Sequence, residues 1–221
     1  MSKRLSLLVI VVTLFAMNGV GGCGGGGGGT TGVQSACNPD SFAPNYAHNL
    51  AHLLNWSSFP ITVYFYQDSN YTTHRHDLAI AGFAEWSTAS GGVLGFTEVS
   101  DVSKAVVTVH FDPTTQNGLT YLHFSDLTLT TADIYLGIKN QLDPDLQVVA
   151  AHEFGHTLGI DGHSSNTADL MYAIHYIGTP EFVTQNDINT VKTAYCHLFG
   201  RAACVRRDSR PGAPITTVVI Q

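Results

Sequence analysis

Hydrophobic and polar residues change their spacing several times between residues 60 and 196, and each change predicts an element. Short runs of β-branched and aromatic residues predict strands, and five such runs cover residues 61–66, 96–99, 105–111, 119–124 and 132–136. After the first run, apolar residues recur at helical spacing, namely Ala79, Phe83 and Trp86. This spacing predicts a helix that begins near residue 73 and ends at Gly91.

Two more helices are predicted towards the end of the chain. Asp143 is placed to cap the first, Pro144 suits its first turn, and Asp145 favours the positive end of a helix dipole. Thr184 with Asp187 three residues later is a pattern that caps a final helix. The apolar stripe of that helix consists of Ile188, Val191 and Tyr195. These elements outline one domain of ordinary length.

Histidines cluster at the end of the middle predicted helix. His152 and His156 are four residues apart, so they project from one helical face and can reach a single ion about 2 Å away. Glu153 cannot share that position as a helical ligand, but it can hold a water molecule beside the metal. Gly159 suits the turn that ends the helix. A further ligand must therefore come from beyond this turn.

The motif as it stands, HEFGHTLGIDGHSS, resembles the extended zinc signature H-E-x-x-H-x-x-G-x-x-H of the metzincin peptidases, and among them the matrixins. In this chain the position of the third histidine is Gly162, and the histidine follows at His163. We interpret Gly162 as a one-residue insertion that still lets His163 close the site. Asp161 is the rival oxygen ligand. Downstream, Asp169-Leu170-Met171-Tyr172 is similar to the matrixin methionine turn, with Met171 as an apolar floor.

The resemblance covers about residues 60–196 and implies a metzincin-like α+β fold. In that fold a twisted, mixed, five-stranded sheet has the active-site helix beneath it, and a small C-terminal subdomain ends in a helix. The resemblance also implies one catalytic zinc ion, with Glu153 as general base of an endopeptidase. The implied zinc ligands are His152, His156 and His163. An extended peptide would lie along residues 119–124 at the sheet edge, and the expected pocket residues are Tyr172, Ile174 and Tyr176.

Two other functions fit the same residues. A zinc-binding surface protein could keep this fold without significant turnover, although the intact Glu153 argues against it. A hydrolase acting on a non-peptide amide would keep the same ligands and differ only in its cleft. We interpret His110 and His123 as ordinary strand residues and His175 as a solvated one, so a second zinc site is not expected, and structural calcium is not indicated.

The beginning of the chain predicts export. Residues 1–22 combine Lys3 and Arg4 with an apolar stretch and small residues before Cys23, which is typical of a signal peptide. Val20-Gly21-Gly22-Cys23 resembles a bacterial lipoprotein box, which implies lipid attachment at Cys23. We therefore expect a lipid anchor in the bacterial cell envelope, at the outer membrane or cell surface, with plain secretion as the alternative. The glycine run that follows makes residues 23–36 a tether.

Lipidation of Cys23 would leave three cysteines, Cys37, Cys196 and Cys204. We expect one disulfide and one free thiol, and three pairings remain open. Cys37-Asn38-Pro39-Asp40 faintly resembles the cysteine segment of matrixin propeptides. Because it lacks the preceding arginine and is one residue short, a structural disulfide from Cys37 to Cys196 or Cys204 is favoured over a latency switch.

Composition and charge limit the classes of binding partner that we expect. The formal net charge is -7, and without a basic stripe nucleic acid is not an expected partner. We expect a monomer that binds a protein or peptide substrate and is held at a membrane through its lipid. The domain is predicted at residues 59–204, after an N-terminal segment at 37–58. Residues 205–221 form a tail, in which 215–220 could add a short strand.

Overall fold

The computed structural model describes residues 42–48, 50, 53–199 and 215–220. All described residues belong to one compact unit within Ser35–Gln221. In chain order its elements are β1 (Ile61–Phe65), α1 (Thr73–Ala89), β2 (Phe96–Glu98), the 3-10 helix η2 (Val102–Lys104), β3 (Val107–Asp112), β4 (Leu119–Ser125), β5 (Thr128–Gly137), α2 (Asp143–Thr157), α3 (Gln185–Phe199) and β6 (Thr216–Ile220).

The strands form one mixed sheet in the order β2-β1-β3-β5-β4-β6. The pairs among β2, β1, β3 and β5 are parallel, whereas β4 is antiparallel to both β5 and β6. The predicted α+β class with a mixed sheet is confirmed, but the count of five strands was wrong. The sixth strand, β6, reads Thr-Thr-Val-Val-Ile; its β-branched residues suit a strand, and it adds to the outer side of β4.

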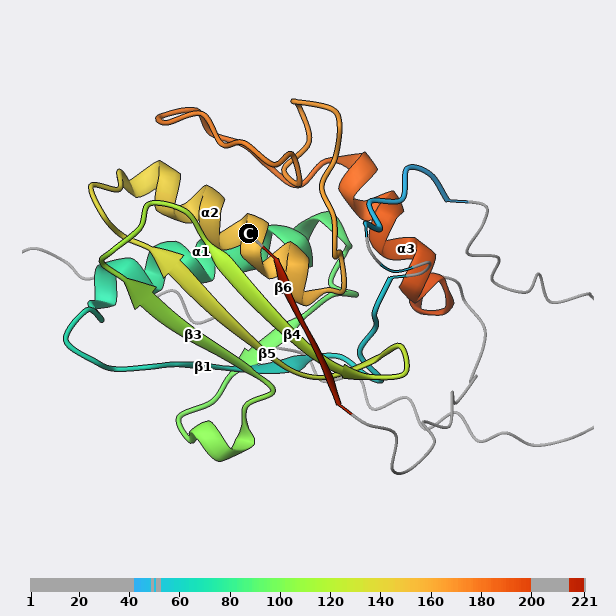
Figure 1. Cartoon of the computed structure of the whole chain (residues 1–221), viewed down its shortest axis with the longest axis horizontal. Coiled ribbons are helices and arrows are strands. Elements are labelled where there is room, and N and C mark those ends of the chain that lie inside the picture. The colour runs from blue at the N-terminus through green and yellow to red at the C-terminus, as the bar shows by residue number, and fades with distance from the viewer. Residues whose placement is uncertain (1–41, 49, 51–52, 200–214, 221) are drawn as a thin grey trace, which may run out of the picture. The chain divides into compact units, whose positions relative to one another are not determined.

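Helices α1 and α2 run across one face of the sheet (Figure 1). Side chains of β1, β3 and β4 alternate between buried and half-buried positions, so one face of each strand supplies the core. Aromatic rings join the layers: Phe83 of α1 stacks on Phe65 of β1 at 5.8 Å and on Phe154 of α2 at 4.5 Å between ring centroids. The histidine-bearing helix is thereby fixed against the sheet.

The predicted cap of α2 was wrong by one residue. Leu142 occupies the capping position without a side-chain hydrogen bond, and Asp143 is the first helical residue. Its Oδ2 lies 2.9 Å from Nε2 of His74 in α1. At α3 the predicted cap is present, because the Thr184 amide donates to Asp187 Oδ2 at 2.7 Å and the Asp187 amide donates to Thr184 Oγ1 at 3.3 Å.

Several predictions fall outside the described residues: the signal peptide 1–22, lipidation of Cys23, the tether, and the roles of Cys37 and Cys204. Cys196 in α3 is disulfide-bonded, and its partner lies outside the described residues. In the described part of the chain, no helix combines the length and apolar character that a bilayer crossing requires.

Candidate metal centre

Three histidines converge at the C-terminal part of α2. His152 and His156 project from the helix, and His163 approaches from the loop that follows, so that one ligand atom of each lies within 4.8 Å of the others. Ring centroids are 4.8 Å apart for His152 and His156, 5.3 Å for His152 and His163, and 5.0 Å for His156 and His163. The structure therefore brings together the three predicted ligands.

Backbone carbonyls fix which ring nitrogens face the centre. Nδ1 of His152 donates to the Leu170 carbonyl at 2.8 Å, and Nδ1 of His156 donates to the Ile160 carbonyl at 2.7 Å. In neutral rings the two Nε2 atoms then carry lone pairs, and they are 3.1 Å apart. Facing lone pairs repel unless a cation lies between them. Two nitrogens bound to one tetrahedral zinc ion would be separated by about 3.3 Å, so this pair fits a metal.

Burial also favours neutral imidazoles. It lowers the pKa of His152 to about 4 and holds the pKa of His156 well below its usual range. The pKa of His163 is lowered by burial and by the nearby His48. Because a metal binds the unprotonated ring, the protein keeps all three rings ready for a cation at neutral pH.

The turn between α2 and His163 depends on two glycines. Gly159 has φ +98, and a Cβ there would collide with the Leu54 carbonyl oxygen. Gly162, the predicted insertion, lies so close to residues 46–48 that a Cβ would collide with the Tyr46 carbonyl oxygen. Both positions thus require glycine for close backbone approach, and Gly159 also for its left-handed conformation.

Asp161, the rival ligand, has another partner. It is 3% exposed, and its two carboxylate oxygens accept hydrogen bonds from the backbone amides of His48 at 3.0 Å and Leu50 at 3.1 Å. Its carboxylate thus holds the N-terminal segment. This placement favours His163 over Asp161 as the third ligand.

Glu153 lies between the histidines on the inner side of β4. Its side chain is buried, and the Thr120 hydroxyl donates to Oε2 at 2.6 Å. Burial raises the pKa of Glu153 to about 8 in the absence of metal, and the Thr120 hydrogen bond partly offsets this shift. A bound cation would lower the pKa again. Gly118 packs directly against this carboxyl group, because a Cβ there would overlap it.

Met171 is fully buried and packs against Gly155 of α2, which fits the predicted floor. Two carboxylates hold the turn that contains Met171, and neither of them was assigned to the site from the sequence. Asp187 accepts from the amides of Leu170 at 3.1 Å and Met171 at 3.3 Å. Asp169 accepts the Tyr46 hydroxyl at 2.7 Å. The only sequence signal for Asp187 was its place in the cap of α3.

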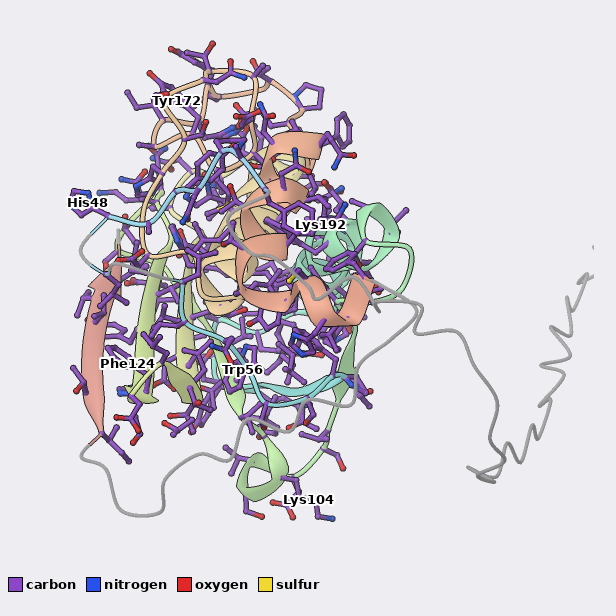
Figure 2. The ribbon with its side chains drawn as sticks, turned by 90° about the vertical axis from the view of Figure 1, so that its right-hand side faces the viewer. His48, Trp56, Lys104, Phe124, Tyr172 and Lys192 are labelled. Atoms are coloured by element: carbon purple, nitrogen blue, oxygen red, sulfur yellow. The ribbon has the colours of Figure 1, made fainter. Side chains whose placement is uncertain are left out.

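The three predicted pocket residues lie in the loop after Met171. Tyr172 is half-buried, whereas Ile174 and Tyr176 are 55% and 52% exposed. Figure 2 shows Tyr172 at the top of the molecule, in the loop before α3. Side chains of this loop are thus available to a ligand.

The expectation of a solvated His175 is wrong. Its Nε2 lies 3.0 Å from the buried Asp145 and its Nδ1 lies 3.1 Å from Glu181. The amide of Gly178 also donates to Asp145, at 2.6 Å. These contacts attach the loop after Met171 to the first turn of α2.

The expected open edge at residues 119–124 is also wrong. β4 pairs with β5 on one side and with β6 on the other. Figure 2 shows β6 as the outermost strand, beside the strand that carries Phe124. A peptide that extends the sheet along β4 would need the position that β6 occupies.

Comparison with known proteins agrees with the signature. Residues 135–196 match the family model described as Matrixin. Karilysin of Tannerella forsythia is 28% identical over an alignment of 170 residues, which covers 65% of this chain and 34% of karilysin. The chain thus spans about a third of the length of this relative. These matches show a matrixin-like, metzincin resemblance over a segment that contains the three histidines, and they support a zinc metalloprotease in general terms.

Proposed function

We propose that this chain is a zinc-dependent endopeptidase. The observation that carries the proposal is the convergence of three neutral imidazoles beside one buried glutamate, Glu153. The matrixin-like segment at residues 135–196 supports the same function. Three nitrogen ligands are also the set that leaves a position of zinc open for water and substrate, whereas structural zinc sites are closed by four protein ligands.

Zinc bound at this site would act as a Lewis acid towards the peptide carbonyl and lower the pKa of water to about 7. Glu153 provides the proton transfers. One of its oxygens accepts the Thr120 hydroxyl, which orients the carboxylate and leaves the other oxygen for the attacking water. Glu153 takes a proton as that water attacks the carbonyl carbon, and it then passes the proton to the nitrogen of the leaving amine. The peptide bond is thereby split with no proton left over.

The substrate would be an extended peptide. Backbone hydrogen bonds to a strand give affinity that depends little on sequence, and side-chain pockets give selectivity. The exposed Ile174 and Tyr176 in the loop after Met171 are suited to contact apolar substrate side chains. This arrangement fits an endopeptidase that accepts unfolded or exposed segments of proteins.

The test is to purify the metal-loaded chain, measure bound zinc, and compare cleavage of a diverse peptide library by wild type and Glu153→Gln. The amide can still accept the Thr120 hydroxyl but cannot carry the proton. We expect unchanged zinc, about one ion per chain, and a loss in kcat on the order of 10²- to 10⁴-fold or more. Glu85→Gln is the matched control, because Glu85 is half-buried and bonded to Gln147 in the layer between α1 and α2.

The alternative is a zinc-binding surface protein without turnover. It would be supported if the wild type holds zinc but cleaves no peptide in the library, or if Glu153→Gln cleaves as fast as the wild type. A hydrolase of non-peptide amides would be supported by zinc-dependent cleavage of small amides without cleavage of peptides. Each result removes the endopeptidase proposal.

We also propose that the protein is exported and anchored in the bacterial cell envelope through lipid on Cys23. The support is the signal-like residues 1–22 and the lipoprotein-like Val20-Gly21-Gly22-Cys23. An anchor followed by a glycine-rich tether would keep the domain near a membrane while allowing it to reorient.

A further inference from the structure

Strand β6 covers β4 next to the catalytic glutamate. The two strands are antiparallel, and Ile220 pairs with Thr120, Val219 with Tyr121 and Val218 with Leu122. Thr120 is also the residue whose hydroxyl binds Glu153 at 2.6 Å. β6 therefore runs along β4 towards the site, and Figure 1 shows it lying along β4.

The side chain of Ile220, at the end of β6, lies on the face of the sheet that carries Glu153. Directly paired residues of antiparallel strands point to the same face of a sheet, and Thr120 points towards α2, where it contacts Glu153. Ile220 therefore points the same way and is 5% exposed. A peptide that paired with β4 in place of β6 would direct the side chain opposite Thr120 to this same face.

The other end of β6 is held on the outer face of the sheet. The Thr217 hydroxyl lies 2.8 Å from Nδ1 of His123, whose Nε2 lies 3.0 Å from Asp133 Oδ2. Asp133 also contacts the Thr108 hydroxyl. Side chains on three further strands thus fix the register of β6.

We propose that residues 216–220 act as an intramolecular competitor for the substrate-binding edge of β4, and that β6 must leave this edge before an extended peptide can bind. The proposal rests on the proposed peptidase function. Each backbone N–H is a single donor, so β6 and a substrate strand cannot pair with the same groups of β4. The bound strand also indicates the kind of peptide that the edge accepts, an extended segment of β-branched residues with an apolar side chain opposite Thr120.

β6 has the properties of an exchangeable strand. It has five residues, of which Thr216, Thr217 and Val219 are exposed and only Ile220 is buried. A single short strand that buries so little contributes weakly to stability. If β6 is detached in about one molecule in ten, the apparent affinity for a peptide is about tenfold weaker than that of the free edge.

The first experiment uses the full, zinc-loaded chain with Val218→Pro and Val219→Pro together. Neighbouring residues of a strand direct their amides to opposite sides, so one of the two prolines must remove a donor facing β4. We expect KM for a fluorogenic peptide to fall about tenfold, with kcat unchanged. The matched control is Val219→Thr, which keeps a β-branched residue at an exposed strand position and should leave KM unchanged. Unchanged KM in the proline variant overturns the proposal.

The second experiment measures binding without turnover. A labelled peptide, Thr-Thr-Val-Val-Ile-Gln, is titrated into zinc-loaded Glu153→Gln with and without the two prolines, and anisotropy is followed. We expect about tenfold tighter binding to the form with prolines. Equal affinities, or no binding to either form, overturn the proposal.

Two controls separate the outcomes. If no form cleaves peptides but the labelled peptide still binds more tightly to the proline form, the peptidase function fails while the edge competition stands. If the proline variant loses its cooperative melting transition or its zinc, β6 is a structural element and the competitor proposal is wrong.

Discussion

Replacing Asp169 with asparagine should weaken the fold and loosen the metal centre together. The carboxylate gathers side chains from separate segments: Oδ2 accepts the hydroxyls of Tyr46 and Ser164, both at 2.7 Å, and Oδ1 accepts the Thr184 hydroxyl at 2.9 Å. The amide group of Asn186 donates to the same carboxylate at 3.2 Å. An asparagine side chain would place its NH2 group, a donor, against some of these hydroxyl and amide donors, and it would also remove the negative charge.

The magnitude follows from these contacts. A hydrogen bond to a charged group contributes about 1.5–3 kcal/mol and a neutral one about 0.5–1.5 kcal/mol. Losing the difference at three hydroxyls gives about 3 kcal/mol, which corresponds to a fall of about 10 °C in melting temperature for a domain of this size.

The effect should also depend on pH. Burial acts to raise the pKa of Asp169, but hydrogen bonds from neighbouring side chains outweigh it and leave the pKa below its ordinary value. Stability from such a carboxylate is present above its unfolded pKa of about 3.9 and is lost as pH falls through the folded pKa. The difference between wild type and variant should therefore be full at pH 7 and shrink below about pH 4.

The assay is thermal unfolding followed by circular dichroism at pH 7 and below about pH 4. Asp126→Asn is the control, because Asp126 is exposed in a turn and its φ of +56 suits asparagine. Competition with a chelator measures the metal site. His152 binds the carbonyl of Leu170, next to Asp169, so zinc affinity should fall about 10- to 100-fold. An Asp169→Asn variant with the melting temperature of the control and the zinc affinity of the wild type would refute this reasoning.

Three further predictions concern the site and its anchor. His163→Ala should weaken zinc retention strongly, whereas Asp161→Ala should lower the melting temperature and change zinc retention little; equilibrium dialysis with a chelator ranks them, and the reverse order would make the carboxylate the ligand. Gly118→Ala places a methyl group against Glu153, so it should reduce kcat by at least about tenfold while zinc content is retained, and steady-state kinetics with metal analysis checks it. Cys23→Ser should move the protein from the detergent phase to the aqueous phase in a partitioning experiment, and a wild type already in the aqueous phase would contradict the lipid anchor.

Local patterns predicted the elements that bury one face. β1, β3 and β4 alternate in burial along their lengths, and this alternation is visible in the sequence because each strand has one side in the core. The start of α3 was also predictable, since Thr184 and Asp187 exchange hydrogen bonds within one turn. The histidine spacing worked for the same reason, because one helix carries two of the three rings.

What the sequence did not reveal depends on contacts between distant residues. Asp187 was interpreted only as a capping residue, yet it also holds Leu170 and Met171. Asp161 was considered as a ligand because it lies next to the motif, but its partners are 113 and 111 residues away. β6 was expected as an optional strand of a tail, and nothing in its composition indicates that it pairs with β4. Pairing partners are set by the whole fold and not by local composition.

The contact between Asp161 and the amides of His48 and Leu50 has a consequence for the order in which the protein assembles. Such contacts close very long loops. Closing a loop costs conformational entropy, and this cost opposes folding until the contact has formed. Helix α2 carries His152 and His156 within one element, whereas the turn before His163 also makes contacts with this distant segment. We therefore expect a folding chain to present a two-histidine site first and to bind zinc tightly only late in folding.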